Sequence, residues 1–133
     1  MNVRNKSIKF ITVPQVLAIH SQLVKRYGGS QGIRDIGLVE SSVARAQAGF
    51  GGEYLYKNIF DMASALLQSL LKNHPFVDGN KRTALTSAAI FLKLNGYKLI
   101  NNHKEEVNFA LKVDNSLTIE QISEWLEARC KKV

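Results

Sequence analysis

Residues 58–73 constrain the fold of this chain most, because their apolar side chains recur at helical spacing. The apolar residues of this segment form one broad stripe: Ile59, Met62, Ala63, Leu66, Leu67, Leu70 and Leu71. A helix with so broad an apolar face must be buried against other elements. Pro75 ends the pattern, since the residue before a proline avoids helical torsions. The segment therefore predicts a long buried helix that stops just before residue 75.

The remaining segments predict further helices joined by short connections. The expected helices are a first that begins at Thr12 and Pro14 and stops at Gly28, then 35–49, 80–94 and 105–112, and a last that opens at Thr118 with Gln121 as a capping box. Strand-like patterns are limited to residues 8–13 and 97–100. We expect an all-α fold: a compact single domain over residues 1–133, with about six helices and at most short strands.

Composition narrows the class of partner and the compartment. The 133 residues carry a net charge of +7, which favours an anionic partner. There is no run of five like charges and no zinc-finger spacing, so direct DNA binding is not expected, although a small basic nucleic-acid binder remains a rival interpretation. No stretch suits a signal peptide or a membrane span. The single cysteine, Cys130, favours the cytoplasm and is expected to be an inert residue of the last helix.

One polar segment, residues 74–84, lies between two strongly apolar helices. Gly79, Asn80 and Lys81 open the second of these helices, where the first backbone N–H groups lack internal partners and attract anions. Lys81 and Arg82 add positive charge at the same end, and a guanidinium can bind two phosphate oxygens at once. Cations at a helix N-terminus oppose the helix dipole, so this conflict indicates function. The segment predicts a phosphate site.

Two further side chains of the segment suit chemistry on a phosphate. Asp78 is the only acid among six basic residues between residues 72 and 104. Its carboxylate suits Mg²⁺, and it equally suits a cap on the following helix; both roles are compatible. His74 can take a proton from an incoming hydroxyl, or it can simply end the preceding helix. Phe76 is expected to anchor the loop in the core. A transition-metal site from His74, His103 and Asp78 lacks ligand spacing, and His20 is interpreted as a packing residue.

Residues 74–82, His-Pro-Phe-Val-Asp-Gly-Asn-Lys-Arg, resemble the signature of the Fic/Doc superfamily. AMP-transferring Fic members have the pattern H-P-F-x-D/E-G-N-G-R-x-x-R. This chain departs from it at Lys81 and Leu85, and both departures are similar to the Doc branch, H-x-F-x-D/N-A/G-N-K-R-T-A. The similarity extends through residues 26–29, 32–41 and 95–96.

The resemblance implies a bundle of about six helices and a toxin of a toxin–antitoxin pair. Such a toxin would move the γ-phosphate of ATP, or of another nucleoside triphosphate, to a threonine of elongation factor Tu and so stop translation. His74 would be the catalytic base and Asp78 the Mg²⁺ ligand. Phe76 would anchor the loop, and the phosphates would be held by Gly79, Asn80, Lys81 and Arg82.

The departures from the Fic pattern favour the phosphate-transferring alternative. Lys81 adds bulk and charge where Fic enzymes have glycine, and Leu85 removes an arginine, so the nucleotide is expected to present its γ-phosphate. An AMP transferase and a catalytically silent antitoxin-binding relative are the alternatives. No intact inhibitory S/T-x-x-x-E-G/N helix is present, so a cognate antitoxin is expected to supply one in trans. Gly51, Gly52 and Glu53 resemble the flap that docks target peptides, and an ordinary loop is the alternative.

Overall fold

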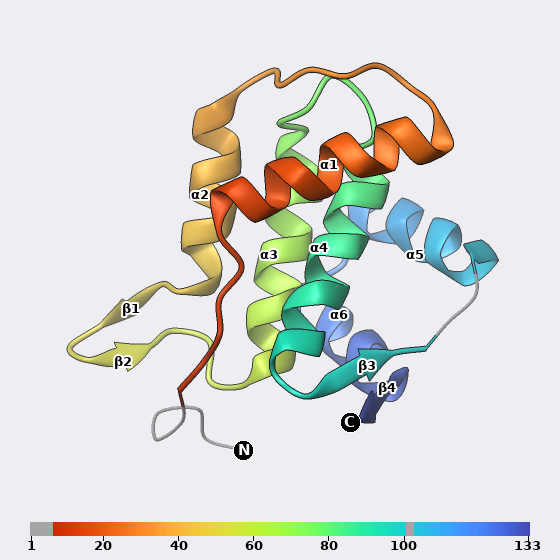
Figure 1. Ribbon diagram of the computed structural model, residues 1–133. Helices are drawn as coiled ribbons and strands as arrows, with labels where there is room; N and C mark the ends of the chain where they lie inside the picture. The colour runs from red at the N-terminus through yellow and green to blue at the C-terminus, as the bar shows by residue number, and fades with distance from the viewer. Residues whose placement is uncertain (1–6, 101–102) are drawn as a thin grey trace.

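A computed structural model describes residues 7–100 and 103–133 and has six α-helices in this part of the chain (Figure 1). The helices are α1 (Val13–Tyr27), α2 (Ile36–Ala46), α3 (Ile59–Asn73), α4 (Asn80–Leu94), α5 (His103–Asn115) and α6 (Ile119–Ala128). Two short antiparallel pairs complete the fold, β1 (Gly49–Phe50) with β2 (Glu53–Tyr54) and β3 (Tyr97–Leu99) with β4 (Cys130–Lys132). The expected all-α class is confirmed.

Helix α3 is the centre of the bundle, and its sequence explains why. Its apolar stripe is so broad that ten of its side chains are buried. It contacts α2, α4, α5 and α6, and Figure 1 shows it running from the bottom of the molecule to the top. Helix α4 begins at Asn80 and ends at Leu94, as the sequence predicts, and packs against α3 in the reverse direction. The segment between them, residues 74–79, is therefore placed at one end of the core.

Helix α1 crosses in front of α4, and Figure 1 shows the two at a wide angle. It begins where the sequence predicts, with Thr12 as N-cap and Pro14 in the first turn, and the structure adds a capping box between Thr12 and Gln15. Its buried side chains, Val16, His20 and Val24, recur every four residues. The turn of α1 that contains Val24 lies beside the segment that joins α3 and α4.

Several sequence predictions are corrected by the structure. Residues 8–12 form no strand, because the backbone N–H and C=O of Lys9 bond to the Asn95 side-chain amide, at 3.1 and 2.9 Å. Asp35 is the N-cap of α2 but makes no side-chain cap bond. Helix α5 extends beyond 105–112, and Cys130 lies on β4, after the last helix. No helix in residues 7–100 and 103–133 has the length and apolar character that crossing a bilayer requires.

Candidate functional site

The 74–79 loop joins the end of α3 to the start of α4, and the α1–α2 connection, residues 28–35, runs beside it. Ile33 and Phe76 form an antiparallel bridge, flanked by backbone hydrogen bonds of 2.7 and 3.1 Å. Phe76 is 1% exposed, so its ring anchors the loop in the core as expected. Ile33 and Val77, by contrast, are 46% and 60% exposed. The loop thus combines a fixed backbone with an apolar outer surface.

The side chain of Asn80 holds the other edge of the loop. Its amide nitrogen donates to the Phe76 carbonyl at 2.9 Å, and its amide oxygen accepts from the Phe76 N–H at 3.0 Å. This pair of bonds imitates a neighbouring strand and satisfies both backbone groups of Phe76. The Asn80 side chain is therefore occupied in shaping the loop, and contact with a phosphate stays a prediction for its backbone N–H.

The first turn of α4 gathers the predicted phosphate-binding groups. Gly79 is its N-cap, with φ 77° and ψ 19°, a left-handed conformation that favours glycine. The backbone N–H groups of Asn80, Lys81 and Arg82 have no acceptor within the described part of the chain. No acidic residue lies in this turn, and the side chains of Lys81 and Arg82 are exposed. Backbone donors and positive charge therefore converge at one helix end, which suits an anion.

Arg82 is held in place by an aromatic ring. Its guanidinium lies 4.2 Å from the centre of the Tyr27 ring, at cation–π distance. A pocket of about 380 Å³ opens beside this pair. It is lined by Leu23, Tyr27, Lys81, Arg82, Leu85, Thr86, Glu106 and Ala110. The lining combines two cations and one acid, Glu106, with apolar side chains, so it carries net positive charge and fits an organic phosphate.

The carboxylate of Asp78 is exposed and lies at the same helix end. One oxygen accepts from the Gly79 N–H at 2.9 Å and the other from the Ser30 N–H at 3.1 Å. Gly29 permits this approach: a Cβ there would lie 2.7 Å from the Asp78 oxygen. Asp78 is not the N-cap of α4, which corrects that interpretation; Gly79 is.

The carboxylate oxygens of Asp78 are suitable ligands for a Mg²⁺ ion that binds together with phosphate. Each carboxylate oxygen accepts one backbone hydrogen bond and keeps lone-pair capacity toward solvent. Residues 7–100 and 103–133 contain no group of three His, Cys, Asp or Glu side chains placed to hold a metal. One carboxylate with water and phosphate oxygens is the usual way in which Mg²⁺ binds, so Asp78 would hold it and the substrate would complete the shell.

His74 adopts an unusual backbone conformation at the C-terminal end of α3. It has φ 47° and ψ 58°, and among the described non-glycine residues it alone has positive φ. Arg34 secures this turn: its guanidinium donates to the carbonyls of His74 and Asn73, at 2.7 and 2.6 Å. Left-handed torsions cost an ordinary residue roughly 1–2 kcal/mol. Such strain is typical of functional positions, and here it leaves the His74 side chain exposed beside the loop.

His20 was missed as a site residue by the sequence analysis. It is 3% exposed, its ring stacks on Phe76 at 3.8 Å and 7°, and its Nε2 lies 2.7 Å from the Asp78 carbonyl oxygen. The signal was present in the sequence: a histidine on the buried stripe of α1, between Val16 and Val24, needs a polar partner. Arg34 was missed as well. It lies in a connection between helices, where no periodic pattern predicts which residues a side chain contacts.

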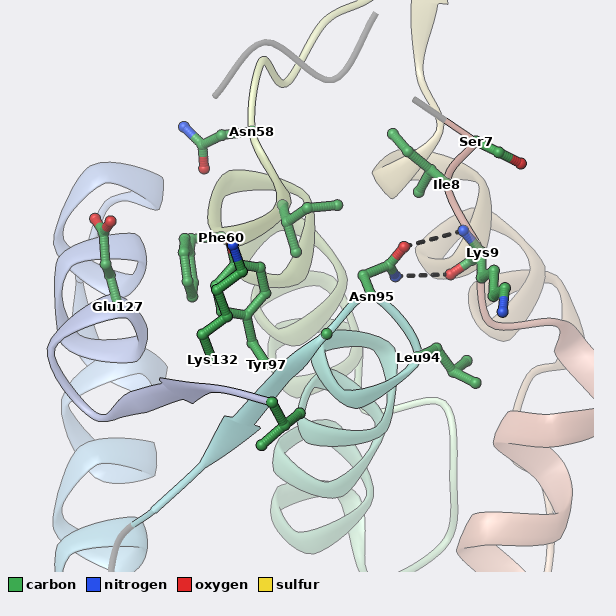
Figure 2. A pocket seen from close by; sticks show the side chains of 13 residues that line it. Ser7, Ile8, Lys9, Asn58, Phe60, Leu94, Asn95, Tyr97, Glu127 and Lys132 are labelled. Carbon is green, nitrogen blue, oxygen red and sulfur yellow. Dashed lines mark hydrogen bonds between the residues drawn. The ribbon is translucent and has the colours of Figure 1, made fainter. Parts of the chain in front are cut away.

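The hairpin and a second pocket lie away from this loop. Gly51, Gly52 and Glu53 belong to the β1–β2 hairpin, which precedes α3, whereas His74 follows α3; Figure 1 shows the two at opposite ends of the helix. Figure 2 shows a pocket of about 390 Å³ at that same far end, between the start of α3 and the end of α4. The structure brings His74, Asp78 and the α4 N-terminus together, but does not bring the hairpin to them.

The surroundings of Cys130 disfavour it as a nucleophile. Burial, together with the nearby carboxylate of Glu127, raises the pKa of its thiol to about 11. A thiol with so high a pKa is almost entirely protonated near neutral pH, and only the thiolate is reactive. The sequence interpretation of Cys130 as chemically inert is confirmed, although its place on β4 is not the one expected.

Comparison with known proteins agrees with this geometry. The family model described as "Fic/DOC family" matches residues 10–92, which is more than half of the chain. This chain belongs to the Fic/DOC family. Its matched region runs from the segment before α1 into the last turn of α4 and contains the 74–79 loop and the first turn of α4, whereas Glu106 and Ala110 of the pocket lie beyond it.

Two curated proteins are similar to this chain. "Toxin Doc" of Mycolicibacterium smegmatis is 51% identical over 73 residues, which cover 55% of this chain and 56% of the relative. "Protein kinase doc" of Escherichia phage P1 is 34% identical over 95 residues, which cover 71% of this chain and 75% of the relative. The match thus spans little more than half of the mycobacterial protein and three quarters of the phage protein.

Proposed function

We propose that this Fic/DOC protein transfers the γ-phosphate of a nucleoside triphosphate, ATP in the simplest case, to a hydroxyl of a protein. The observation that carries the proposal is the first turn of α4, where Lys81, Arg82 and three backbone N–H groups with no acceptor in residues 7–100 and 103–133 converge beside the Asp78 carboxylate. Phosphoryl transfer depends mainly on positioning and charge neutralisation, which these groups can supply.

The residues of the site have distinct roles in the proposed transfer. The α4 amides, Lys81 and Arg82 bind the phosphate oxygens and neutralise their charge. Mg²⁺ held by Asp78 would offset further phosphate charge. His74 accepts the proton of the incoming hydroxyl while that oxygen forms a bond to the γ-phosphorus. The bond between the γ-phosphorus and the bridging oxygen breaks, and the nucleoside diphosphate leaves.

Lys81 and Leu85 favour transfer of phosphate over transfer of AMP. Leu85 is 8% exposed and lies on the wall of the pocket beside Arg82, so that wall is apolar where an arginine would add a phosphate clamp. The charge of the site is therefore concentrated at the first turn of α4. We infer that the γ-phosphate is seated there and faces His74. The AMP transferase and the silent relative are the alternatives that the experiment below separates.

The biological role proposed is that of a toxin, supported by the names of the two relatives, "Toxin Doc" and "Protein kinase doc". The proposed acceptor is a threonine of elongation factor Tu, and its modification would stop translation. A cognate antitoxin would supply an inhibitory segment in trans.

Target docking is proposed on the apolar surface around the loop, in preference to the β1–β2 hairpin. Val77 lies in the loop that carries the catalytic groups, Ile33 pairs with that loop and Ile36 opens α2 just after the connection; they are 60%, 46% and 45% exposed. Ile33→Ser is expected to raise KM for the protein target several-fold and to leave KM for ATP unchanged. The matched control is Phe50→Ser in the hairpin, where Phe50 is 95% exposed. Steady-state kinetics with both variants checks this, and the opposite ranking would restore the hairpin as the docking flap.

Intact-mass spectrometry of elongation factor Tu tests the proposed function. The factor is incubated with the protein, ATP and Mg²⁺, beside a His74→Ala control. A gain of one phosphate that is lost in the control is the expected result. A gain of one AMP would establish the AMP-transferring alternative and overturn the interpretation of Lys81 and Leu85. No change in either sample would reject elongation factor Tu as the acceptor and favour a different target or the catalytically silent relative.

A further inference from the structure

His20 is a residue through which α1 contacts the 74–79 loop. The side chain is 3% exposed, and its ring lies parallel to that of Phe76, with 3.8 Å between the ring centres and 7° between the planes. Its Nε2 is 2.7 Å from the backbone carbonyl oxygen of Asp78. The ring is thus fixed by stacking on one face and by a short hydrogen bond at its edge.

The partner of this hydrogen bond determines which ring nitrogen carries a proton. A backbone carbonyl oxygen can only accept, so Nε2 of His20 must be the donor. A buried imidazole donor aimed at this carbonyl holds the ring and the peptide in one orientation, because breaking the bond would leave the buried N–H of His20 unsatisfied.

The peptide unit that His20 holds also aims the Asp78 carboxylate. The Asp78 carbonyl and the Gly79 N–H belong to one planar peptide and point in opposite directions. His20 holds the carbonyl end at 2.7 Å, and the N–H end donates to the carboxylate of Asp78 at 2.9 Å. A rotation of this plane would move the carboxylate and the first turn of α4 together. His20 therefore acts on both halves of the phosphate site through a single peptide.

His20 and Val24 also line the side of Gly79 on which a Cβ would lie. A Cβ built on Gly79 would be 3.6 Å from Cδ2 and 3.7 Å from Nε2 of His20, and 3.5 Å from Cγ2 of Val24. These are ordinary van der Waals distances, so α1 leaves room for a Cβ there. Glycine at this position is therefore favoured by its left-handed torsion, φ 77°, and not by lack of space.

From these contacts we infer that His20 is a positioning residue of the phosphate site: it orients the Asp78 carboxylate and the α4 amides toward a magnesium-bound nucleotide without touching the nucleotide. This inference rests on the proposed function for the identity of the ligand. The geometry of the peptide between Asp78 and Gly79 does not depend on it.

The first experiment reads the tautomer of His20 directly. Nitrogen–proton correlation spectra of the full-length protein, labelled with ¹⁵N and free of nucleotide, are expected to show a proton on Nε2 of His20. A His20 ring that carries its proton only on Nδ1 would overturn the inference, since Nε2 could not then donate to Asp78.

The second experiment separates the hydrogen bond from the stacking with two variants. His20→Gln keeps an amide donor near the position of Nε2 and removes the ring, whereas His20→Phe keeps a stacking ring and removes the donor. His20→Phe is expected to weaken binding of ATP with Mg²⁺ by about 10–100-fold, as is typical when a group that orients a metal ligand is lost. His20→Gln is expected to lose less affinity for ATP with Mg²⁺ than His20→Phe. Isothermal titration calorimetry measures the binding, and equal losses in both variants would overturn the inference.

Val16→Ala is the control for general destabilisation of α1. Val16 is fully buried one turn before His20. The variant is expected to lower the melting temperature and leave the affinity for ATP with Mg²⁺ unchanged. A loss of affinity that follows melting temperature across all three variants would reduce His20 to a packing residue and contradict the inference.

The inference and the proposed function can fail separately. A protein that binds ATP with Mg²⁺ but phosphorylates no target would reject the function and still test His20 by calorimetry. If the nucleotide does not bind, the backbone amide signals of Ser30 and Gly79 give the answer, because both N–H groups donate to the Asp78 carboxylate. They are expected to shift more in His20→Phe than in His20→Gln, and the reverse order would overturn the inference.

Discussion

His74→Ala is expected to slow phosphoryl transfer on the order of 10²–10⁴-fold, the range for losing a positioned general base. The binding groups of the α4 N-terminus are untouched, so the loss should appear in kcat, with little change in KM for ATP. Single-turnover kinetics with a saturating protein target measures the chemical step. A rate within a few-fold of wild type would exclude His74 as the base.

His74→Gly separates catalysis from stability at the same position. Relief of the left-handed torsion at φ 47° favours the folded state by roughly 1–2 kcal/mol, while the freedom that glycine gains in the unfolded chain costs about 0.5–1 kcal/mol. The variant should therefore unfold at the same or a slightly higher urea concentration than wild type, although it is inactive.

His74→Asn is the control for this pair. Asparagine tolerates left-handed torsions and keeps a small polar side chain, but it cannot act as a base near neutral pH. It should match wild type in stability and His74→Ala in activity. A clearly destabilised His74→Gly would mean that the imidazole holds the loop, so that the strain at this residue would not be a mark of function.

The sequence predicted the helices well, since their periodicity and end signals are local. Helix α4 begins and ends at the expected residues, and the capping box expected at Thr118 and Gln121 forms. The errors have non-local causes. Residues 8–12 alternate like a strand, but the Asn95 side chain, 86 residues away, binds the backbone of Lys9 instead. Strand β4 has no periodic signal, and it forms because it meets β3.

The candidate site was predicted in part for the same reason. Residues 74–82 are contiguous, so their chemistry can be interpreted from spacing alone. The groups that hold them come from elsewhere in the chain: His20 from α1, and Ser30 and Arg34 from the α1–α2 connection. No spacing rule relates these residues to the loop, because only the crossing of α1 over α4 brings them together. Asn80 differs from these residues. Its place in the motif was clear from the sequence, but its side chain bonds to the Phe76 backbone, which the motif alone did not predict.

Phe76→Ala is expected to lower the free energy of unfolding by about 3–5 kcal/mol, as is typical of a fully buried phenylalanine. Phe76 is 1% exposed and stacks against His20, so truncation leaves a cavity and removes the partner ring. The total free energy of unfolding of a small domain is about 5–15 kcal/mol, so this loss is a large fraction of the stability. Urea denaturation monitored by circular dichroism measures the change. A loss below about 1.5 kcal/mol would mean that the loop is not anchored through this ring.

Replacement by leucine distinguishes anchoring of the loop from general core packing. Phe76→Leu and Phe91→Leu remove similar volume from positions that are 1% and 0% exposed, so both should cost comparable stability. Phe91 lies in the second half of α4, away from the 74–79 loop, and its variant should keep the wild-type rate per folded molecule. Phe76→Leu should lose activity, because the same residue stacks on His20 and carries the backbone groups that Asn80 binds. Equal activity in the two variants would show that the site tolerates movement of its anchor. Loss in Phe76→Leu alone would show that core packing and phosphate-site geometry depend on the same contacts.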